Sequence, residues 1–312
     1  MTSTRTRALA AAALVVALAT GTAACGGDKS AGSSKAAGAA AGSSASAAPT
    51  AAQSPLAVTP AAFLQQVAQK TGGQKSAKVS EDIKTPSGEV TAQGPISWGD
   101  GLLGSLTMQL PTAVTSKVGS GGPADVIYQS DAMYVNLHMS QAALAQLGGK
   151  HWFKYDYADL AKLMGAAGTS FENSLKNADP VTAVQSMIAS GQVTEVGKDS
   201  VNGTPATHYA ADLNLGQMSG AGTSLTQDQV SALRQQLQSQ GVTKAHFDVW
   251  VDGQGLLLKQ EAKSQTANGQ IDVSATYTDY GTQVTVTPPA ADDTVDAAQL
   301  IARAQQGQSG GN

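Results

Sequence analysis

The stretch AHFDVWVDGQGLLLKQEAKSQTANGQIDVSATYT, residues 245–278, decides the fold. In residues 245–251 and 271–277, apolar and polar side chains alternate, which is typical of a β-strand with one buried face. Asp252-Gly253 and Asn268-Gly269 fall between the runs, and such pairs are the strongest short signals of a β-hairpin. The stretch therefore predicts three successive antiparallel strands.

The same alternation predicts further strands earlier in the chain. Together the strands are expected to form one long antiparallel meander with one face exposed to solvent. They are expected at Val79–Lys84, Glu89–Trp98, Leu103–Leu110, Val126–Gln129, Met133–His138, Gln192–Asp199 and Thr207–Leu215. Gly99–Gly104 matches G-x-G-x-x-G, but a strand rather than a helix follows it, which favours a hairpin turn over a dinucleotide site.

Four helices are predicted between the strands. Thr59-Pro60, Asp179-Pro180 and the capping box of Thr226 with Gln229 each precede an apolar stripe at helical spacing. Tyr157–Met164 is a shorter helix candidate. The order of elements predicts an α+β domain in which amphipathic helices lie on one face of a curved antiparallel sheet.

The amino-terminal residues have the pattern of an export signal. Arg5 and Arg7 precede the uncharged apolar stretch Ala8–Ala19, and small residues lead to Cys25. This ending resembles a lipobox, at which bacteria attach diacylglycerol to cysteine and cleave just before it. Thr22 stands where most lipoboxes have leucine, and an ordinary cleaved signal with a chance cysteine is the alternative.

These features divide the chain into four parts. We expect a lipoprotein signal peptide in residues 1–24 and a lipidated cysteine with a disordered Ala/Gly/Ser linker in residues 25–58. Residues 59–304 are the folded domain and residues 305–312 a flexible tail. The predicted location is the outer face of the cell membrane, with the domain held outside the cytoplasm by its lipid anchor.

Charge and residue types exclude several classes of function. Removal of Arg5 and Arg7 leaves 17 basic against 23 acidic residues, a net charge of −6 without a basic cluster, so no nucleic-acid binding is expected. Cys25 is the only cysteine, which rules out an internal disulfide and a thiolate metal site. No metal, cofactor or catalytic residue is predicted, and the chain is expected not to be an enzyme.

Several polar and aromatic groups nevertheless invite a functional interpretation. The histidines His138, His151, His208 and His246 are expected to be solvated residues on separate strands rather than metal ligands. The acid pairs Glu81-Asp82, Asp156 with Asp159, and Asp292-Asp293 are interpreted as solvated turns and helix caps rather than a glycosidase pair. The aromatic residues Trp152, Phe153, Tyr155 and Tyr157 predict a strand with aromatic side chains on both faces, with a ligand platform as the alternative.

Taken in order, several segments resemble the LppX/LprG-type lipoproteins of actinobacteria, which are related to the LolA carriers. They are the lipobox at Cys25, DAMYV (131–135), KHWFK (150–154), VNGTPATHY (201–209), VWVDG (249–253), and the ending from Tyr280-Gly281 through Pro288-Pro289 to Asp292-Asp293. The resemblance covers essentially the whole folded part. It implies a half-barrel sheet whose concave face, closed by helices, holds a cavity for acyl chains.

The resemblance also implies a function, which is to bind and carry lipid or acylated amphiphiles in the cell envelope. Apolar helix residues would then form the lid of the cavity, and the alternative is that they simply fill a core. The candidates are Leu160, Leu163, Met164, Phe171, Leu175, Met187, Ile188, Leu233 and Leu237. A second hypothesis is a ligand-free interaction or sensor module that binds an envelope transporter or another protein.

Overall fold

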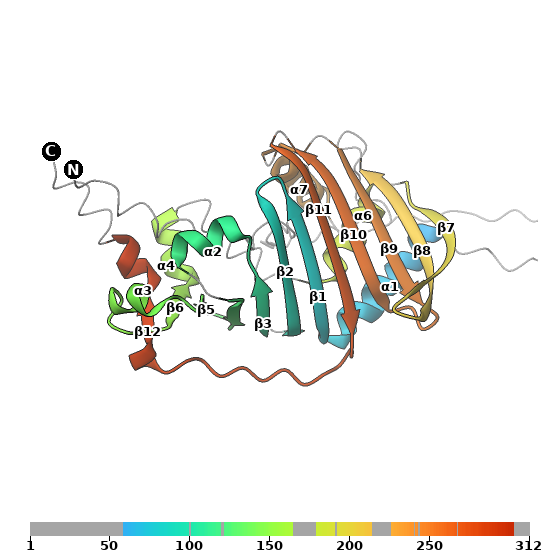
Figure 1. Cartoon of the computed structure of the whole chain (residues 1–312). Coiled ribbons are helices and arrows are strands. Elements are labelled where there is room, and N and C mark those ends of the chain that lie inside the picture. The colour runs from blue at the N-terminus through green and yellow to red at the C-terminus, as the bar shows by residue number, and fades with distance from the viewer. Residues whose placement is uncertain are drawn as a thin grey trace, which may run out of the picture.

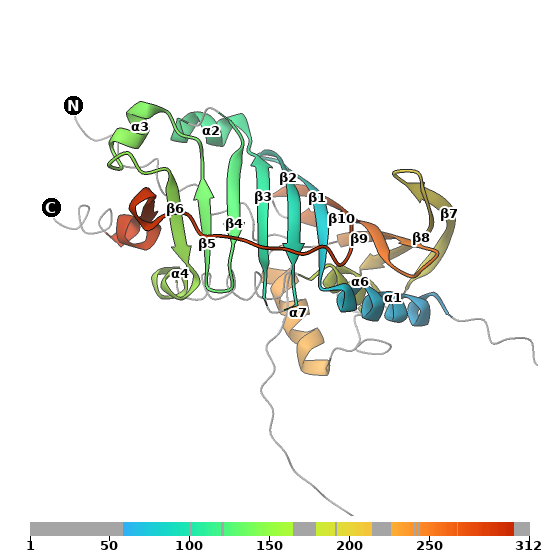
Figure 2. The same cartoon turned by 90° about the horizontal axis from the view of Figure 1, so that it is seen from below.

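The computed structural model shows one strongly twisted sheet with helices packed against it (Figure 1). The structure describes residues 59–99, 101–119, 122–164, 179–190, 192–213, 226–239, 241–242, 244–266 and 268–302. Strands β8–β11 are seen along their length in Figure 1 and obliquely in Figure 2, whereas β5 and β6 are seen along their length in Figure 2 and obliquely in Figure 1, so the strand direction rotates across the sheet. This rotation follows from the right-handed twist of β-strands accumulated across a wide sheet.

Twelve described strands make up the sheet, in the order β12-β6-β5-β4-β3-β2-β1-β11-β10-β9-β8-β7. They are β1 (Ser76–Thr85), β2 (Gly88–Ser97), β3 (Leu103–Gln109), β4 (Ala124–Tyr128), β5 (Ala132–Asn136), β6 (Trp152–Asp156), β7 (Thr194–Val201), β8 (Thr204–Leu213), β9 (Lys244–Asp252), β10 (Leu257–Thr266), β11 (Gly269–Thr278) and β12 (Thr294–Asp296). Neighbouring strands are antiparallel except β12, which runs parallel to β6. The predicted α+β class and curved antiparallel sheet are confirmed, as are the hairpin at Gly99–Gly104 and the strand in the aromatic segment.

The connectivity differs from the single long meander that the sequence predicts. Strands β1 to β6 form one meander and β7 to β11 another, and the two meet where β1 pairs with β11, from Lys78↔Thr278 to Lys84↔Asp272. The first strand of the chain therefore lies in the middle of the sheet. Local sequence patterns carry no information on this pairing, because its partners are almost 200 residues apart.

The described helices are α1 (Pro60–Gln74), α2 (Thr112–Val118), α3 (Gln141–Ala145), α4 (Tyr157–Met164), α6 (Val181–Ala189) and α7 (Gln227–Ser239). The predicted helix starts are confirmed, whereas the short α2 and α3 were not predicted. At the start of α1 the hydroxyl of Thr59 accepts a hydrogen bond from the backbone N–H of Ala62, at 3.3 Å. At the start of α6 the carboxylate of Asp179 accepts one from the backbone N–H of Val181, at 2.8 Å. Side-chain caps of this kind satisfy amides that have no partner within the helix.

The main core lies between the helices and one face of the sheet, here called the inner face. Leu64 and Val67 of α1 and Val184, Met187 and Ile188 of α6 are buried there with apolar side chains of the strands. Helix α1 packs on α6 and β10, α6 packs on β8 and β9, and α4 packs on β6. The helix-to-sheet packing of the described chain is therefore concentrated on the two flanks of the sheet.

After β11 the chain returns from the middle of the sheet to the edge formed by β12. Residues 279–293 run along the ends of the central strands to reach β12 beside β6 (Figures 1 and 2). Contacts at both ends hold this segment. Near its start the hydroxyl of Ser76 donates to the carbonyl of Thr282 at 2.7 Å, and at its end His151 pairs with Asp293 at 2.7 Å. Within the described ranges, no helix is both long enough and apolar enough to cross a bilayer.

Candidate functional site

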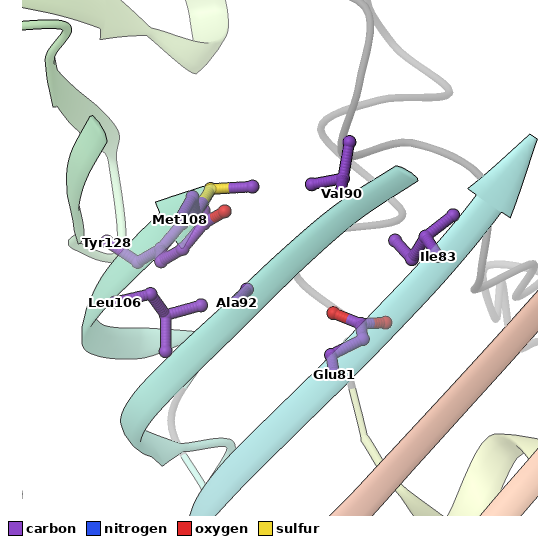
Figure 3. Close-up of a pocket in the computed structure, with 7 residues that line it drawn as sticks. All are labelled: Glu81, Ile83, Val90, Ala92, Leu106, Met108 and Tyr128. Atoms are coloured by element: carbon purple, nitrogen blue, oxygen red, sulfur yellow. The ribbon is translucent and has the colours of Figure 1, made fainter. Parts of the chain in front are cut away.

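Strands β1 to β4 line a small hollow on the inner face, here called the β1–β4 hollow (Figure 3). Its walls are Glu81 and Ile83 from β1, Val90 and Ala92 from β2, Leu106 and Met108 from β3, and Tyr128 from β4. The cavity measures about 20 Å³, which is room for about one water molecule. Because ligand pockets usually exceed ~300 Å³, the hollow as it stands accepts one polar group and not an acyl chain.

One row of directly paired residues crosses the sheet beside the hollow. From β2 to β10 it runs Ala92, Glu81, Ala275 and Gln260. Directly paired residues of antiparallel strands point to the same face, so both polar side chains lie on the inner face. Because an alanine stands on each side of Glu81, its carboxylate has no bulky neighbour within the row.

The carboxylate of Glu81 lies in apolar surroundings. Burial raises the pKa of Glu81 from 4.5 to about 7. Although the side chain keeps some accessible surface in the hollow, protein atoms surround it, and desolvation of the charged form is the cause of the rise. Among the described residues, no hydrogen bond or ion pair holds this carboxylate. The interpretation of Glu81-Asp82 as a solvated turn is therefore wrong for Glu81: both residues lie mid-strand, and only Asp82 points to the opposite face.

A second polar group on the inner face is the amide of Gln260. Its Nε2 donates to the phenolic oxygen of Tyr277 at 2.9 Å, while its buried Oε1 has no partner among the described residues. A buried polar atom without a partner costs about 1–3 kcal/mol relative to a hydrogen-bonded one. The inner face thus presents two unsatisfied polar groups, the carboxylate of Glu81 and the amide oxygen of Gln260, on either side of Ala275.

Two buried phenols lie close enough to Glu81 to sense its charge. Burial raises the pKa of Tyr128 and of Tyr277 well above the ordinary value of 10, and the negative charge of Glu81 raises both further. Both phenols therefore remain protonated at neutral pH and can donate a hydrogen bond. The site combines hydrogen-bond donors, acceptors and apolar walls without a strong nucleophile.

The predicted cavity residues on the helices are only partly described. Met187 and Ile188 of α6 are buried in the main core, and Leu237 of α7 is half-buried against a smaller cluster around Val230 and Ala245. The helical positions of Leu160, Leu163 and Met164 in α4 and of Leu233 in α7 are confirmed, but their side chains lie outside the described part. Phe171, Leu175 and the lipidation candidate Cys25 lie outside the described residues. Met187 and Ile188 therefore fill the core of the protein, which is the alternative to a place in the lid of a cavity.

Each of the four histidines pairs with an aspartate. The pairs are His138–Asp125 at 2.8 Å, His151–Asp293 at 2.7 Å, His208–Asp248 at 2.7 Å and His246–Asp212 at 2.7 Å. The expectation that all four lie on separate strands is wrong for the first two, which lie in loops, because the strands next to them end at Asn136 and begin at Trp152. In the part of the chain that the structure describes, no cluster of three or more potential ligands could hold a metal ion.

The sequence did not reveal an ordered cluster on the opposite face of the sheet, here called the outer face. The ring of His208 stacks on Trp250 with centroids 4.4 Å apart, and Lys259 lies over the same indole, its Nζ 4.5 Å from the ring centroid. The indole N–H donates to Asp199 at 2.8 Å. The buried Asp248 pairs with His208. The sequence predicts that this face is exposed to solvent, but here its side chains form a packed, hydrogen-bonded cluster.

Several of the remaining acidic groups have structural partners. The carboxylate of Asp156 accepts hydrogen bonds from the backbone N–H groups of Ala158 and Asp159 and thereby caps α4, as predicted. Asp293 accepts hydrogen bonds from both the ring and the backbone of His151, which lowers the pKa of Asp293. Glu81 differs from these acids because it is buried on the apolar inner face and has no partner in the described chain.

Comparison with known sequences gives two relatives from Streptomyces. The chain is 38% identical over 250 residues to a Streptomyces griseus protein named "Uncharacterized 31.2 kDa protein in rplA-rplJ intergenic region", covering 78% of this chain and 81% of that one. It is 31% identical over 243 residues to "Putative lipoprotein SCO4650" of Streptomyces coelicolor, covering 77% and 75%. No family model matches the chain.

Two solved structures are similar to the chain at greater distance. LprF of Mycobacterium bovis is 15% identical with a TM-score of 0.45, covering 75% of this chain and 99% of that one. The lipoprotein LppX of Mycobacterium tuberculosis is 12% identical with a TM-score of 0.43, covering 73% and 100%. The details of the site therefore come from this chain alone.

Proposed function

Because this chain belongs to the LppX/LprG-type family of actinobacterial lipoproteins, we propose that it binds a lipid or another acylated amphiphile on the inner face of its sheet. The observation that carries the proposal is the apolar lining of the inner face at the β1–β4 hollow, between the two flanks where helices pack; the hollow must widen to admit an acyl chain. Six of its seven lining residues are apolar or aromatic. An acyl chain gains about 0.8 kcal/mol for each methylene removed from water, so binding needs no chemistry.

The proposal includes attachment to the outer face of the cell membrane through a diacylglycerol on Cys25. The support is the lipobox-like sequence and the relative named as a lipoprotein. The linker of residues 25–58 would let the domain stand away from the bilayer, since a flexible coil of this length spans about 30 Å. In the native host, Cys25→Ser should move the protein from the membrane fraction to the soluble one, and continued membrane retention would contradict the anchor.

Lipid binding is tested on the mature chain carrying Cys25→Ser, so that the anchor cannot be mistaken for a ligand. The protein is purified from its host without detergent and analysed by native mass spectrometry. The proposal predicts a population with additional mass that organic extraction identifies as lipid, and uptake of added lipid by the remaining protein. Recovery of unliganded protein alone, with no uptake, would refute it.

A second function is an interaction module that binds an envelope transporter or another protein without a ligand. The cavity of about 20 Å³ favours it, because a core so nearly filled needs no guest. The same mass spectrometry separates the two functions, since the module should stay unliganded. Crosslinking in intact cells would then be expected to join it to one specific partner.

A further inference from the structure

We propose that Glu81 anchors a hydroxyl group of the bound amphiphile, so that the chain prefers hydroxylated lipids to lipids that lack a hydrogen-bond donor. The inference rests on the proposed function and adds the polar chemistry that the ligand must carry. Its basis is a carboxylate placed on the apolar inner face at the edge of the β1–β4 hollow, without a partner in the described chain.

The size and shape of the hollow fit one oxygen-sized group. About 20 Å³ is the room that one water molecule needs, and a hydroxyl oxygen has nearly the same size. Alanines at positions 92 and 275 flank Glu81 in the transverse row, and Ala92 also lines the hollow, so no large side chain of this row separates the carboxylate from the hollow. The remaining walls, including Leu106 and Met108, suit the hydrocarbon that carries the hydroxyl.

The amide of Gln260 offers a second point of attachment. Whichever way the amide is turned, one of its two ends pairs with Tyr277 and the other has no partner in the described chain. Gln260 and Glu81 are two strands apart, about 10 Å at ordinary strand spacing, and only Ala275 stands between them in the row. A ligand with two neighbouring polar atoms, such as a diol or a glycerol ester, could therefore contact both residues.

The surroundings favour a hydroxyl over a charged headgroup. A ligand carboxylate or phosphate would be repelled by Glu81, and an ammonium would lose its hydration in an apolar site. A hydroxyl can donate to the ionised carboxylate and can accept from the protonated one. Because burial brings the pKa of Glu81 to about 7, both forms are present at neutral pH, and the hydroxyl suits either.

The test compares three probes of equal chain length: hexadecane, 1-hexadecanol and hexadecylamine. Each competes with the fluorescent dye N-phenyl-1-naphthylamine for the full mature chain carrying Cys25→Ser. The variants Glu81→Leu and Glu81→Gln are measured beside the parent. The control is Asp82→Asn, which alters a carboxylate on the same strand but on the outer face.

The measured quantity is the ratio of the alkane Kd to the alkanol Kd. We expect Glu81→Leu to lower this ratio about tenfold or more, the factor that corresponds to a hydrogen bond to a charged group. Glu81→Gln keeps a hydrogen-bonding group and should lower the ratio by less, and Asp82→Asn should leave it unchanged. Far-ultraviolet circular dichroism checks that each variant is folded.

Other results separate the anchor from the proposed function. Binding of both hexadecane and hexadecanol with the same ratio in the parent and in Glu81→Leu would overturn the anchor and leave lipid binding intact. Tighter binding of hexadecylamine than of hexadecanol would overturn the preference for a neutral hydroxyl. Binding of none of the three probes by the parent would overturn both proposals.

Discussion

Replacing Glu81 by glutamine should stabilise the unliganded protein, by an amount that grows with pH. A carboxyl whose pKa is higher in the folded than in the unfolded chain takes up a proton on folding. For Glu81 the folded value is about 7 against an ordinary 4.5, so its contribution lowers the stability as pH rises from about 4.5 through about 7. Glutamine has nearly the same shape and does not titrate, so the variant avoids this loss.

The magnitude follows from the two pKa values. Each pKa unit of difference corresponds to about 1.4 kcal/mol, which gives about 3 kcal/mol above pH 8. Screening by solvent in the hollow reduces this figure, and we expect a gain of about 2 kcal/mol for Glu81→Gln at pH 8. At pH 4.5 the gain should be close to zero. Tyr128 and Tyr277, whose pKa values Glu81 influences, stay protonated throughout this range.

The assay is urea unfolding of the parent and the variant between pH 4.5 and pH 8, with Asp82→Asn as the control. Other titrating groups contribute equally to both chains and cancel in the difference between their free energies of unfolding. The expected difference widens with pH for Glu81→Gln. Asp82→Asn, which removes a carboxylate that pairs with Lys84 on the outer face, shows the effect of losing a charge from the same strand. A flat difference for Glu81→Gln, or one that narrows with pH, would refute the buried position of the carboxylate.

Two further predictions concern the core and the outer face. Met187→Ala should lower the free energy of unfolding by about 2–5 kcal/mol, because its fully buried side chain would leave a cavity, whereas Val196→Ala, at a 57% exposed position, should change it little. A small loss for Met187→Ala would contradict the packing of α6. The pKa of His246 is raised, chiefly by its hydrogen bond to Asp212, so Asp212→Asn should lower it in an NMR titration. An unchanged value would show that the pair does not form in solution.

Much of the fold could be predicted because its signals are local. Each of these signals depends only on residues that are close together in the sequence. Examples are the turn pairs Asp252-Gly253 and Asn268-Gly269 and the helix start at Thr59. Short elements were missed where tertiary contacts rather than local preference stabilise them. The five residues of α3 are too few to form a stable helix alone, since nucleation is costly.

The burial of Glu81, the central residue of the site, can be predicted from the same alternation that predicts its strand. In Val79-Ser80-Glu81-Asp82-Ile83 the alternation places Glu81 on the same face as Val79 and Ile83, both of which are buried. A charged residue on the same strand face as buried apolar residues is a stronger sign of a functional site than two acidic residues that are adjacent in the sequence. The alanine across from it on β11 could not be foreseen, because the register with β11 depends on the whole sheet.

The small size of the hollow is compatible with lipid binding if the helices can move away from the sheet. Exposing Val184, Met187 and Ile188 of α6 would cost about 2 kcal/mol for each side chain, or about 6 kcal/mol together. Burying a chain of sixteen carbons gains about 12 kcal/mol at about 0.8 kcal/mol per methylene, so the ligand can offset this cost. The unliganded chain should then be closed and the liganded chain open, since a ligand favours the state that it binds better. A liganded structure in which α6 keeps its present contacts with β8 and β9 would show that the acyl chain enters by another route.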